Sequence, residues 1–326
     1  MGIKEAVADC LTEMPGQFCS GEALAQKLGV SRNAVWKAIR QLQEEGFPIT
    51  SKKKNGYCLS ADADILTEQE IRRFSRSKVL GNRFYVLPQV DSTNQYCRQL
   101  AREGAVHGTV VTANQQTAGK GRQGRSFCSP PGTGLYFSVL LAQDLLLQDA
   151  PMLTACAAVA ASRAIDGLYG TRMQIKWVND LFLQGKKCCG ILTEGAVSLE
   201  SGKLEHAVVG IGINLRNTES FPEELRCKVT PLEEAVPGCH VRRAELLAAI
   251  LWELEQVLRE LPERRFLPEY RNRSCLLGKT AMIQQSDGTQ KKVAVLEIAE
   301  DCGLVVRDSF GNMETLHSGD VHIVGF

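Results

Sequence analysis

One short stretch of the chain concentrates glycines and cations in a way that predicts anion binding. Within the seven residues from Gly119 to Arg125 there are three glycines and three cations. Glycine lets backbone N–H groups approach a ligand closely, and lysine and arginine supply charge for phosphate or carboxylate groups. The stretch therefore predicts an anion-binding loop. A flexible, solvated basic turn is the alternative interpretation of the same composition.

Two familiar phosphate-binding motifs do not explain this loop. Its spacing, Gly119-x-Gly121-x-x-Gly124, fits the dinucleotide fingerprint, but that motif requires a helix to begin at the loop. Residues 126–132 contain two prolines and a glycine and cannot begin a helix there. Farther on, Gly278-Lys279-Thr280 resembles the end of a P-loop, yet Arg273 stands where the first glycine of that motif is required.

The composition predicts a soluble protein of two or three domains. The chain has 326 residues, 44% of them hydrophobic, and a net charge of +1, so any contact with nucleic acid must come from a local patch. No long apolar run predicts a membrane span, and the N-terminus lacks the apolar stretch of a signal peptide. The twelve cysteines include no Cys-x-x-Cys pair, which predicts reduced thiols in the cytoplasm and no zinc site.

Residues 1–62 predict a winged helix-turn-helix domain that binds DNA. Ser20 caps a helix from Gly21 to Leu28, and Ser31 caps a longer helix that ends near Glu45; the helix-turn-helix covers about 20–39. The wing, about 49–59, is a hairpin with Asn55-Gly56 as a type I′ turn. A helical module for protein contacts is the alternative. The residues expected to contact DNA are Arg32, Asn33, Lys37, Arg40, Lys52, Lys53 and Lys54.

The remaining chain completes an α+β protein. Residues 63–275 alternate strand-like and helical segments, with Ser92 or Thr93 as the cap of one helix and a hairpin turn at 184–186. A helix that opens near Thr67 is expected to end near Gly81, and two helices are expected over 241–261 and 262–274. Residues 276–326 read as short strands separated by turns, which predicts a small barrel.

Five ordered motifs of the middle region resemble those of the biotin–protein ligases. They are Asp-Ser-Thr-Asn at 91–94, the glycine-basic loop at 116–125, Lys-Trp-Val-Asn-Asp at 176–180, Lys-Cys-Cys-Gly-Ile-Leu at 187–192 and Gly-Ile-Gly-Ile-Asn-Leu at 210–215. With the winged helix-turn-helix in front, the whole chain resembles the bifunctional biotin–protein ligase and biotin operon repressor family. The resemblance implies a mixed-sheet ligase domain of the biotin/lipoate ligase type over 63–275 and an SH3-like barrel over 276–326.

The chain departs from the family's usual pattern at three positions. The family usually has arginine where this chain has Lys120, proline where it has Val178, and tryptophan where it has Phe127. Lysine cannot form the bidentate fork of arginine, so at position 120 the backbone keeps its role while the side chain's role changes. Phe127 can still stack on a purine, with less area.

The resemblance implies two half-reactions. Biotin and MgATP give biotinyl-5′-AMP and pyrophosphate, and a lysine of a biotin carrier domain, of the acetyl-CoA carboxylase type, then attacks the adenylate. The biotin carboxylate and the α-phosphate repel each other, so a cation must lie between them. Lys187 is expected to be that cation, with Arg122 and Arg125 steering the phosphates, and no nucleophilic side chain is needed.

The same resemblance assigns binding residues, partners and a switch. Biotin contacts are implied for Ser92, Thr93, Asn94, Gln116, Lys120, Gly121, Arg122 and Lys187. Nucleotide contacts are implied for Gly119, Arg125, Phe127, Asn179, Asp180 and Asn214. Mg²⁺ is expected to arrive with ATP, and no metal site of the protein's own is expected. The loop is expected to be mobile when empty and to close over biotinyl-AMP, which would create a homodimer that binds operator DNA.

Two other functions fit parts of the sequence. A ligand-sensing transcription factor without turnover would not require the loop cations and Lys187. A lipoate or octanoate ligase shares the catalytic fold, but it usually carries a Gly-Gly-Gly loop followed by a histidine and lacks the winged helix. Exchange of pyrophosphate with ATP, driven by biotin or by lipoate, separates these alternatives.

Overall fold

The computed structural model of the chain describes residues 2–44, 47–142, 150–197, 204–284, 290–317 and 320–323. The chain forms two compact units. The first comprises Met1–Arg73 with Arg242–Ala244, and the second comprises Phe74–Val241 with Glu245–Phe326. Among the described residues, no helix is long and apolar enough to cross a membrane.

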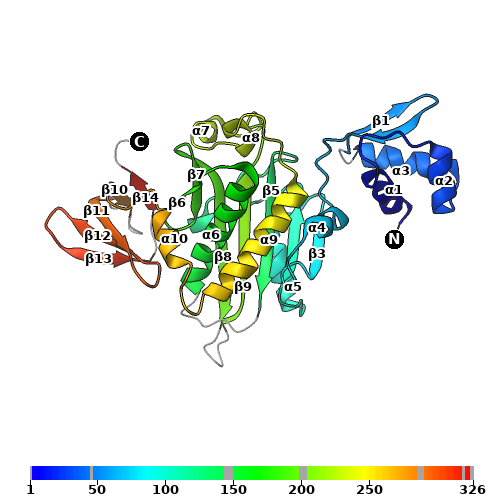
Figure 1. The fold of residues 1–326 in the computed structure, drawn as a ribbon. Helices are drawn as coiled ribbons and strands as arrows, with labels where there is room; N and C mark the ends of the chain where they lie inside the picture. Colours follow the sequence, from blue (N-terminus) through cyan, green and yellow to red (C-terminus); the bar gives the residue numbers. More distant parts are fainter. Residues whose placement is uncertain are drawn as a thin grey trace. The chain divides into compact units, whose positions relative to one another are not determined.

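The first unit contains the helices α1, α2 and α3, a two-stranded wing and nearly all of α4 (Glu68–Phe74) (Figure 1). Both serines cap helices as predicted, since the Ala23 N–H donates to Ser20 Oγ over 3.0 Å and the Ala34 N–H donates to Ser31 Oγ over 3.1 Å. The helix-turn-helix prediction is therefore confirmed, although Glu45 and Gly46, where the third helix was expected to end, lie outside the described residues. The elements are α1 (Ile3–Thr12), α2 (Gly21–Leu28), α3 (Arg32–Glu44), β1 (Ile49–Lys52) and β2 (Gly56–Leu59).

The core of the first unit comes from one face of each helix. In α3 the buried positions are Val35, Ala38, Ile39 and Leu42, which is the i, i+3, i+4, i+7 pattern of an amphipathic helix. They pack with apolar side chains of α1, α2 and both wing strands. The other face of α3 is thus left to solvent.

The turn of the wing differs from the prediction. Lys52 pairs with Gly56, so three residues, 53–55, connect the strands, and Asn55-Gly56 is not a two-residue type I′ turn. Gly56 belongs to β2 with a left-handed φ of 94°. A Cβ at Gly56 would overlap the Cys19 carbonyl and lie 2.6 Å from Ser20 Cα. Glycine is required here by close packing of the wing against the segment before α2, as well as by its φ.

The second unit is built on a seven-stranded mixed sheet in the order β3-β4-β5-β9-β8-β7-β6. Only β3 and β4 pair in parallel among these strands; every other neighbouring pair is antiparallel. The hairpin turn predicted at 184–186 is found between β7 and β8, and it consists of Gln184 and Gly185, because Lys186 already pairs with Leu183. The strands are β3 (Arg83–Leu87), β4 (Thr109–Ala113), β5 (Gly134–Leu141), β6 (Gln174–Lys176), β7 (Asp180–Leu183), β8 (Lys186–Val197) and β9 (Leu204–Asn214).

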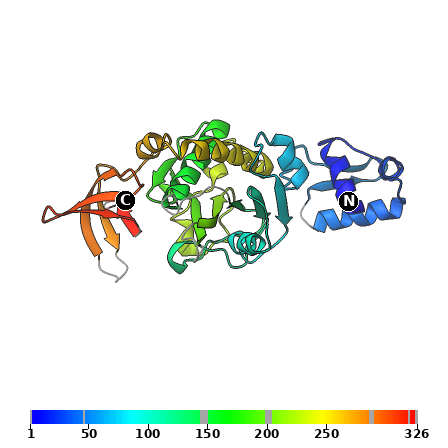
Figure 2. The same ribbon diagram turned by 90° about the horizontal axis from the view of Figure 1, so that it is seen from below.

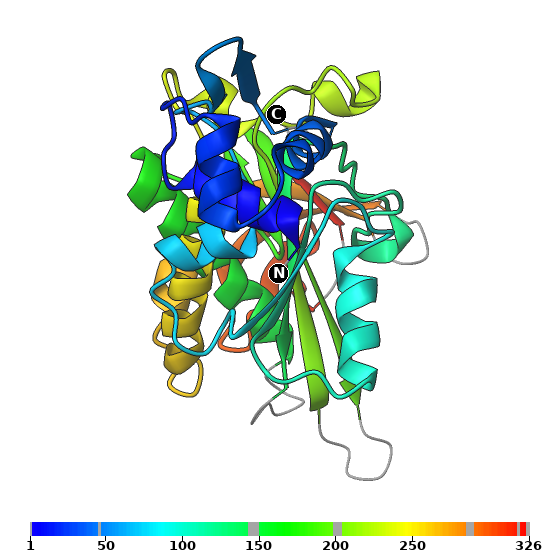
Figure 3. The same cartoon turned by 90° about the vertical axis from the view of Figure 1, so that its right-hand side faces the viewer.

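Helices cover both faces of this sheet. Helix α5 (Thr93–Arg102) lies on one face, and α6 (Ala150–Tyr169) and α9 (Arg243–Glu260) lie on the other (Figures 2 and 3). Every residue of β5 is buried, as expected for a central strand covered on both sides. The shorter helices are α4 (Glu68–Phe74), α7 (Glu223–Arg226), α8 (Leu232–Ala235) and α10 (Leu267–Asn272), together with the 3-10 turn η1 (Arg122–Gly124).

Two predicted helices are shorter than expected. Helix α4 ends at Phe74 rather than near Gly81, and α10 covers only part of 262–274. The residues after α4 turn back because Glu255 of α9 accepts hydrogen bonds from the backbone N–H groups of Lys78, Val79 and Leu80. A buried carboxylate satisfies these donors in place of a further helical turn.

A five-stranded antiparallel sheet, in the order β13-β12-β11-β10-β14, forms the C-terminal part of the second unit. It contacts the part of the unit that holds the seven-stranded sheet, because the Trp177 indole N–H, between β6 and β7, donates to the Cys302 carbonyl over 2.8 Å. The antiparallel sheet was predicted, and its closure into an SH3-like barrel stays a prediction. The strands are β10 (Thr280–Gln284), β11 (Gln290–Ile298), β12 (Leu304–Asp308), β13 (Met313–Leu316) and β14 (Asp320–Ile323).

Candidate functional site

The glycine-basic loop connects β4 to β5 and is closed by its own backbone. The Phe127 N–H donates to the Gly119 carbonyl over 2.8 Å, and the Gly121 N–H donates to the Arg125 carbonyl over 2.7 Å. A Cβ at Gly119 would overlap the Phe127 carbonyl and lie 3.0 Å from Ser129 Oγ. The loop is therefore a tight hairpin whose first glycine is required by close backbone approach, and not an unstructured basic turn.

The loop places Phe127 on a floor made by two glycines of the sheet. Gly190 of β8 and Gly212 of β9 are paired across the two strands. A Cβ at Gly212 would lie 2.6 Å from Phe127 Cε1, and one at Gly190 would lie 3.1 Å from Phe127 Cε2. The ring also meets Tyr136 edge to face, with 6.3 Å between the ring centroids. The two glycines thus leave room above the sheet for the Phe127 ring.

Cations approach this floor from separate segments. Lys187, at the start of β8, forms an ion pair of 2.7 Å with Asp180 of β7, and its Nζ lies 6.0 Å from the centre of the Phe127 ring. Arg122 of the loop donates to Asn179 Oδ1 over 3.3 Å. The β7–β8 hairpin and the loop therefore bring together residues of three motifs that are distant in sequence.

The turn that carries Asn179 and Asp180 is held by two side-chain hydrogen bonds to backbone carbonyls. The Tyr270 hydroxyl donates to the Val178 carbonyl over 3.0 Å, and Asn179 Nδ2 donates to the Ile191 carbonyl over 2.8 Å. Burial raises the pKa of Tyr270 well above its ordinary value, so its hydroxyl stays a donor. These contacts fix the turn next to the loop.

A second group of polar residues forms a network at the start of α5. Gln116 Oε1 accepts the Thr93 N–H over 2.8 Å, and Gln116 Nε2 donates to Ser129 Oγ over 2.8 Å. Asn94 Nδ2 donates to the Leu192 carbonyl over 3.1 Å. The structure thus brings together Thr93, Asn94 and Gln116, three of the residues expected to contact biotin.

Besides Ser129, three residues of this network were not found by sequence reasoning. The buried Ser138 of β5 lies 2.8 Å from Thr93 Oγ1 and 2.7 Å from Asn94 Oδ1. Glu194 of β8 accepts a hydrogen bond from Asn94 Nδ2 over 2.9 Å and pairs with Arg98 over 2.8 Å. The available signal was a lone serine within the apolar run of β5; Glu194 and Arg98 carried none.

The remaining predicted residues differ in their surroundings. Ser92 is the N-cap of α5 by position, but its side chain makes no capping hydrogen bond, which corrects the expected capping role. Lys120 is exposed and donates to Gln95 Oε1 over 2.8 Å, and Arg125 is exposed. Asn214, only 3% exposed at the end of β9, has an Oδ1 that accepts no hydrogen bond from any described residue. Such a buried acceptor suits a ligand that brings a donor.

The cysteines beside the site are not nucleophiles. Burial raises the pKa of the Cys188 thiol to about 12 and raises that of Cys189 well above 9.0. Both thiols are therefore protonated at neutral pH. The geometry accordingly offers cations and amides for binding and charge stabilisation, with no activated thiolate.

The first unit presents a separate basic surface. On α3 the side chains of Arg32, Asn33, Lys37 and Arg40 are exposed, and in the wing Lys53 and Lys54 are exposed at the turn. Lys52, also in the wing, lies 5.0 Å from the centre of the Phe18 ring. The residues expected to contact DNA thus gather on one helix and one hairpin of the same unit.

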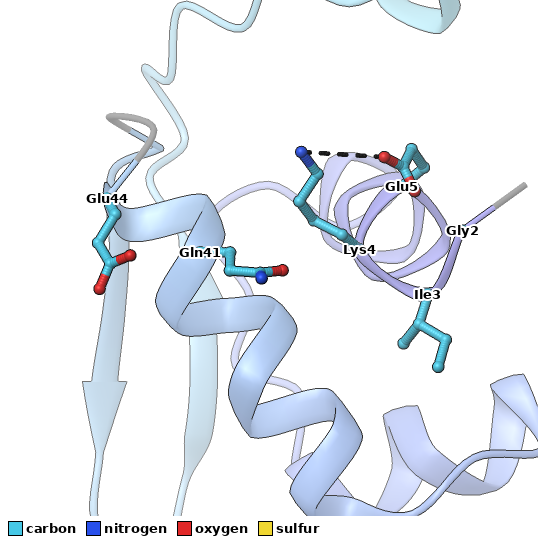
Figure 4. A pocket seen from close by; sticks show the side chains of 6 residues that line it. All are labelled: Gly2, Ile3, Lys4, Glu5, Gln41 and Glu44. Carbon is cyan, nitrogen blue, oxygen red and sulfur yellow. Dashed lines mark ion pairs between the residues drawn. The ribbon is translucent and has the colours of Figure 1, made fainter.

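A shallow pocket in the first unit contains none of these residues (Figure 4). Figure 4 marks an ion pair at its edge between Lys4 and Glu5, whose charged atoms are 3.9 Å apart. The lining residues come from the start of α1 and the end of α3: Gly2, Ile3, Lys4, Glu5, Gln41 and Glu44.

Comparison with known proteins finds a family match in each of the two units. Residues 86–214 match the biotin/lipoate A/B protein ligase family, and residues 5–58 match an HTH domain. The bifunctional ligase/repressor BirA of Bacillus subtilis is 31% identical over 327 residues, which cover 98% of this chain and 98% of that one. The protein of the same name from Escherichia coli is 33% identical over 259 residues, covering 79% of this chain and 77% of that one.

A solved structure extends the similarity to three dimensions. The biotin protein ligase from Aquifex aeolicus, in complex with biotin and ATP, superposes with a TM-score of 0.61 at 28% identity. The match covers 74% of this chain and 98% of that one.

Proposed function

The chain belongs to the family of bifunctional ligase/repressor proteins, and from this premise we propose that it attaches biotin to a carrier protein and represses transcription. The observation that carries the enzymatic half is the approach of Lys187 to the Phe127 ring over Gly190 and Gly212, with Arg122 bonded to Asn179 in the neighbouring turn. An aromatic ring and a cation side by side over the two glycines suit a planar base and a polyphosphate.

The chemistry proceeds in two steps that need no acyl-enzyme. The biotin carboxylate attacks the α-phosphorus of ATP, the bond to pyrophosphate breaks, and biotinyl-5′-AMP forms. A lysine amine of the carrier domain then attacks the acyl carbon, loses its proton and displaces AMP. Lys187 stabilises the negative charge that grows between the two anions in the first step. Its ion pair with Asp180 holds the ammonium in place beforehand.

The binding residues divide between the two networks. We assign the ureido ring and tail of biotin to Ser92, Thr93, Asn94 and Gln116, with Lys120, Gly121, Arg122 and Lys187. We assign the nucleotide to Gly119, Arg125, Phe127, Asn179, Asp180 and Asn214. The unpartnered Oδ1 of Asn214 and the aromatic surface of Phe127 support the second assignment.

Mg²⁺ fits the site as a companion of ATP. Asp180 is a carboxylate beside the site, and Mg²⁺ in nucleotide enzymes is held by one or two carboxylates together with substrate phosphates and water. When bound, the ion neutralises phosphate charge. Asp180 would hold it on the protein side while Lys187 keeps the ammonium near the reacting oxygens.

The repressor half rests on the first unit. The exposed cations of α3 and the wing suit phosphate contacts, and a helix of this kind fits the major groove. We propose that biotinyl-AMP favours a homodimer that binds operator DNA, and that the protein works in the cytoplasm, where its twelve free thiols stay reduced. We also propose the functional division into residues 1–62, 63–275 and 276–326.

One assay tests the enzymatic half. Biotin-dependent exchange of labelled pyrophosphate into ATP is expected, followed by biotin transfer when a carrier domain is added. Exchange driven by lipoate or octanoate and not by biotin would indicate the related ligase activity. Operator binding without any exchange would indicate a sensor without turnover.

A second assay tests the repressor half. A gel shift is expected in the presence of biotin and ATP, and it should weaken steeply as salt increases. Light scattering of the chain with and without biotinyl-AMP tests the dimer. A monomer under both conditions would contradict the proposed coupling.

A further inference from the structure

Trp36 is a large aromatic side chain that the first unit buries only in part. It is 51% exposed and lies in the second turn of α3. Its neighbours Val35 and Ile39 are buried in the core, so the indole projects from the side of the helix that faces solvent. The exposed half of the indole is thus available for contact with a partner, and its surroundings indicate which kind.

The charges around Trp36 indicate the chemistry of that partner. Arg32 and Arg40 stand four residues before and after it, and Asn33 stands three residues before, so all three share its side of the helix. Within the described part of the chain, neither arginine has an acidic side chain within 4.0 Å. An indole flanked by available cations complements a polyanion that also offers an apolar contact.

We propose that Trp36 selects a thymine by packing its indole against the C5-methyl group in the major groove of operator DNA. The thymine methyl is the apolar feature that the major groove displays among its hydrogen-bonding groups. Trp36 is the fifth residue of α3, and residues in the first turns of a recognition helix are the ones that reach base edges. This inference rests on the proposed operator binding and adds a base preference to it.

The partner is DNA rather than another protein because the charges and the placement agree. The arginines beside Trp36 suit the phosphates on either side of the groove. The wing of the same unit adds exposed Lys53 and Lys54. A base contact by Trp36 would thus lie between contacts that the helix and the hairpin make to DNA phosphates.

The test begins with duplexes selected from a random library by the full chain in the presence of biotin and ATP. In the selected duplex each thymidine is then replaced, one at a time, by deoxyuridine, which removes only the methyl group. For the unsubstituted chain, one position in each half-site is expected to lose about fourfold in affinity, the equivalent of one buried methyl group. For Trp36→Ala, replacing thymidine by deoxyuridine at that position is expected to leave the affinity unchanged. At the other positions the replacement should have the same effect as with the unsubstituted chain.

Two further variants separate base selection from general effects. Trp36→Ala should bind the selected duplex roughly 5- to 150-fold more weakly, the range of a single mismatched base pair, and Trp36→Phe should keep part of the preference. Phe310→Ala removes a ring that is 89% exposed in the C-terminal sheet and should change no preference. Lys53→Ala should weaken all duplexes alike and lower the salt dependence by about one phosphate contact.

The outcomes distinguish this inference from the proposed function. If the unsubstituted chain shifts no duplex with biotin and ATP, both fail. If it binds but Trp36→Ala keeps the same thymine preference, or weakens all sequences equally, the inference fails and operator binding stands. If Trp36→Ala abolishes dimerisation measured by light scattering without DNA, Trp36 serves a protein contact and the inference is overturned.

Discussion

Gly210 lies where the sheet meets the network at the start of α5, and an alanine there would disrupt that network. Gly210 of β9 is paired with Ser138 on one side and Leu192 on the other. A methyl group at this position would overlap Asn94 Oδ1 and lie 2.8 Å from Asn94 Cγ. Asn94 has little freedom to move, because its amide is held by Ser138, by the Leu192 carbonyl and by Glu194.

The magnitude follows from the contacts that are lost. Overpacking of a well-filled site costs about 1–3 kcal/mol. If the Asn94 side chain leaves its place, the buried partners left without a hydrogen bond cost about 1–3 kcal/mol more. We therefore expect Gly210→Ala to lower the free energy of unfolding by about 2–6 kcal/mol. A shift of the neighbouring Thr93 by about 1 Å would lower the rate of adenylate formation about 100-fold.

The assay combines thermal unfolding with biotin-dependent exchange of pyrophosphate into ATP. The matched control is Gly167→Ala in α6, where a Cβ has no neighbour within 4 Å. That change should stabilise the helix by up to about 1 kcal/mol and leave exchange unchanged. In an Asn94→Ala background the penalty of Gly210→Ala should nearly vanish, because the clashing side chain is gone. Wild-type exchange and stability in Gly210→Ala, or an equal penalty in both backgrounds, would refute the reasoning.

Three further perturbations test other parts of the site and the fold. Lys187→Met should lower exchange by about 100-fold or more, since it removes the cation between two anions, and should also lower the unfolding temperature slightly, because Asp180 loses its ion-pair partner; near-normal exchange would assign that role elsewhere. Burial opposes ionisation of Glu255, but hydrogen bonds from Ser77 and three backbone N–H groups outweigh it and lower the pKa of this carboxyl below 4.5. Its contribution is present above pH 4.5 and is lost as the pH falls through the lowered pKa, so the loss of melting temperature in Glu255→Gln should be largest at pH 7 and shrink in acid. Proteolysis within 119–125 should be suppressed by biotinyl-AMP; equal cleavage with and without it would count against loop closure.

The sequence predicted what depends on local pattern and on ordered motifs. The serine caps of α2 and α3 and the Gln184-Gly185 turn are set by neighbouring residues, so they were readable directly. The role of Gly56 in the wing was misassigned because it depends on contact with Cys19, far away in the chain. Ser138 was missed for the same reason, since its function arises only when β5 lies beneath α5.

At position 120 the chain has lysine where the family usually has arginine, and the structure of the loop explains why lysine is tolerated there. The shape of the loop comes from backbone hydrogen bonds of Gly119 and Gly121, which do not depend on the side chain between them. The Lys120 ammonium donates to Gln95 in an exposed position, where a single donor is sufficient. Arg122, in contrast, reaches Asn179 in the neighbouring hairpin, and its planar fork has donors left for a phosphate or carboxylate. Lysine is therefore compatible with position 120, and Arg122 is the residue of this loop that we propose for a bidentate contact with the substrate.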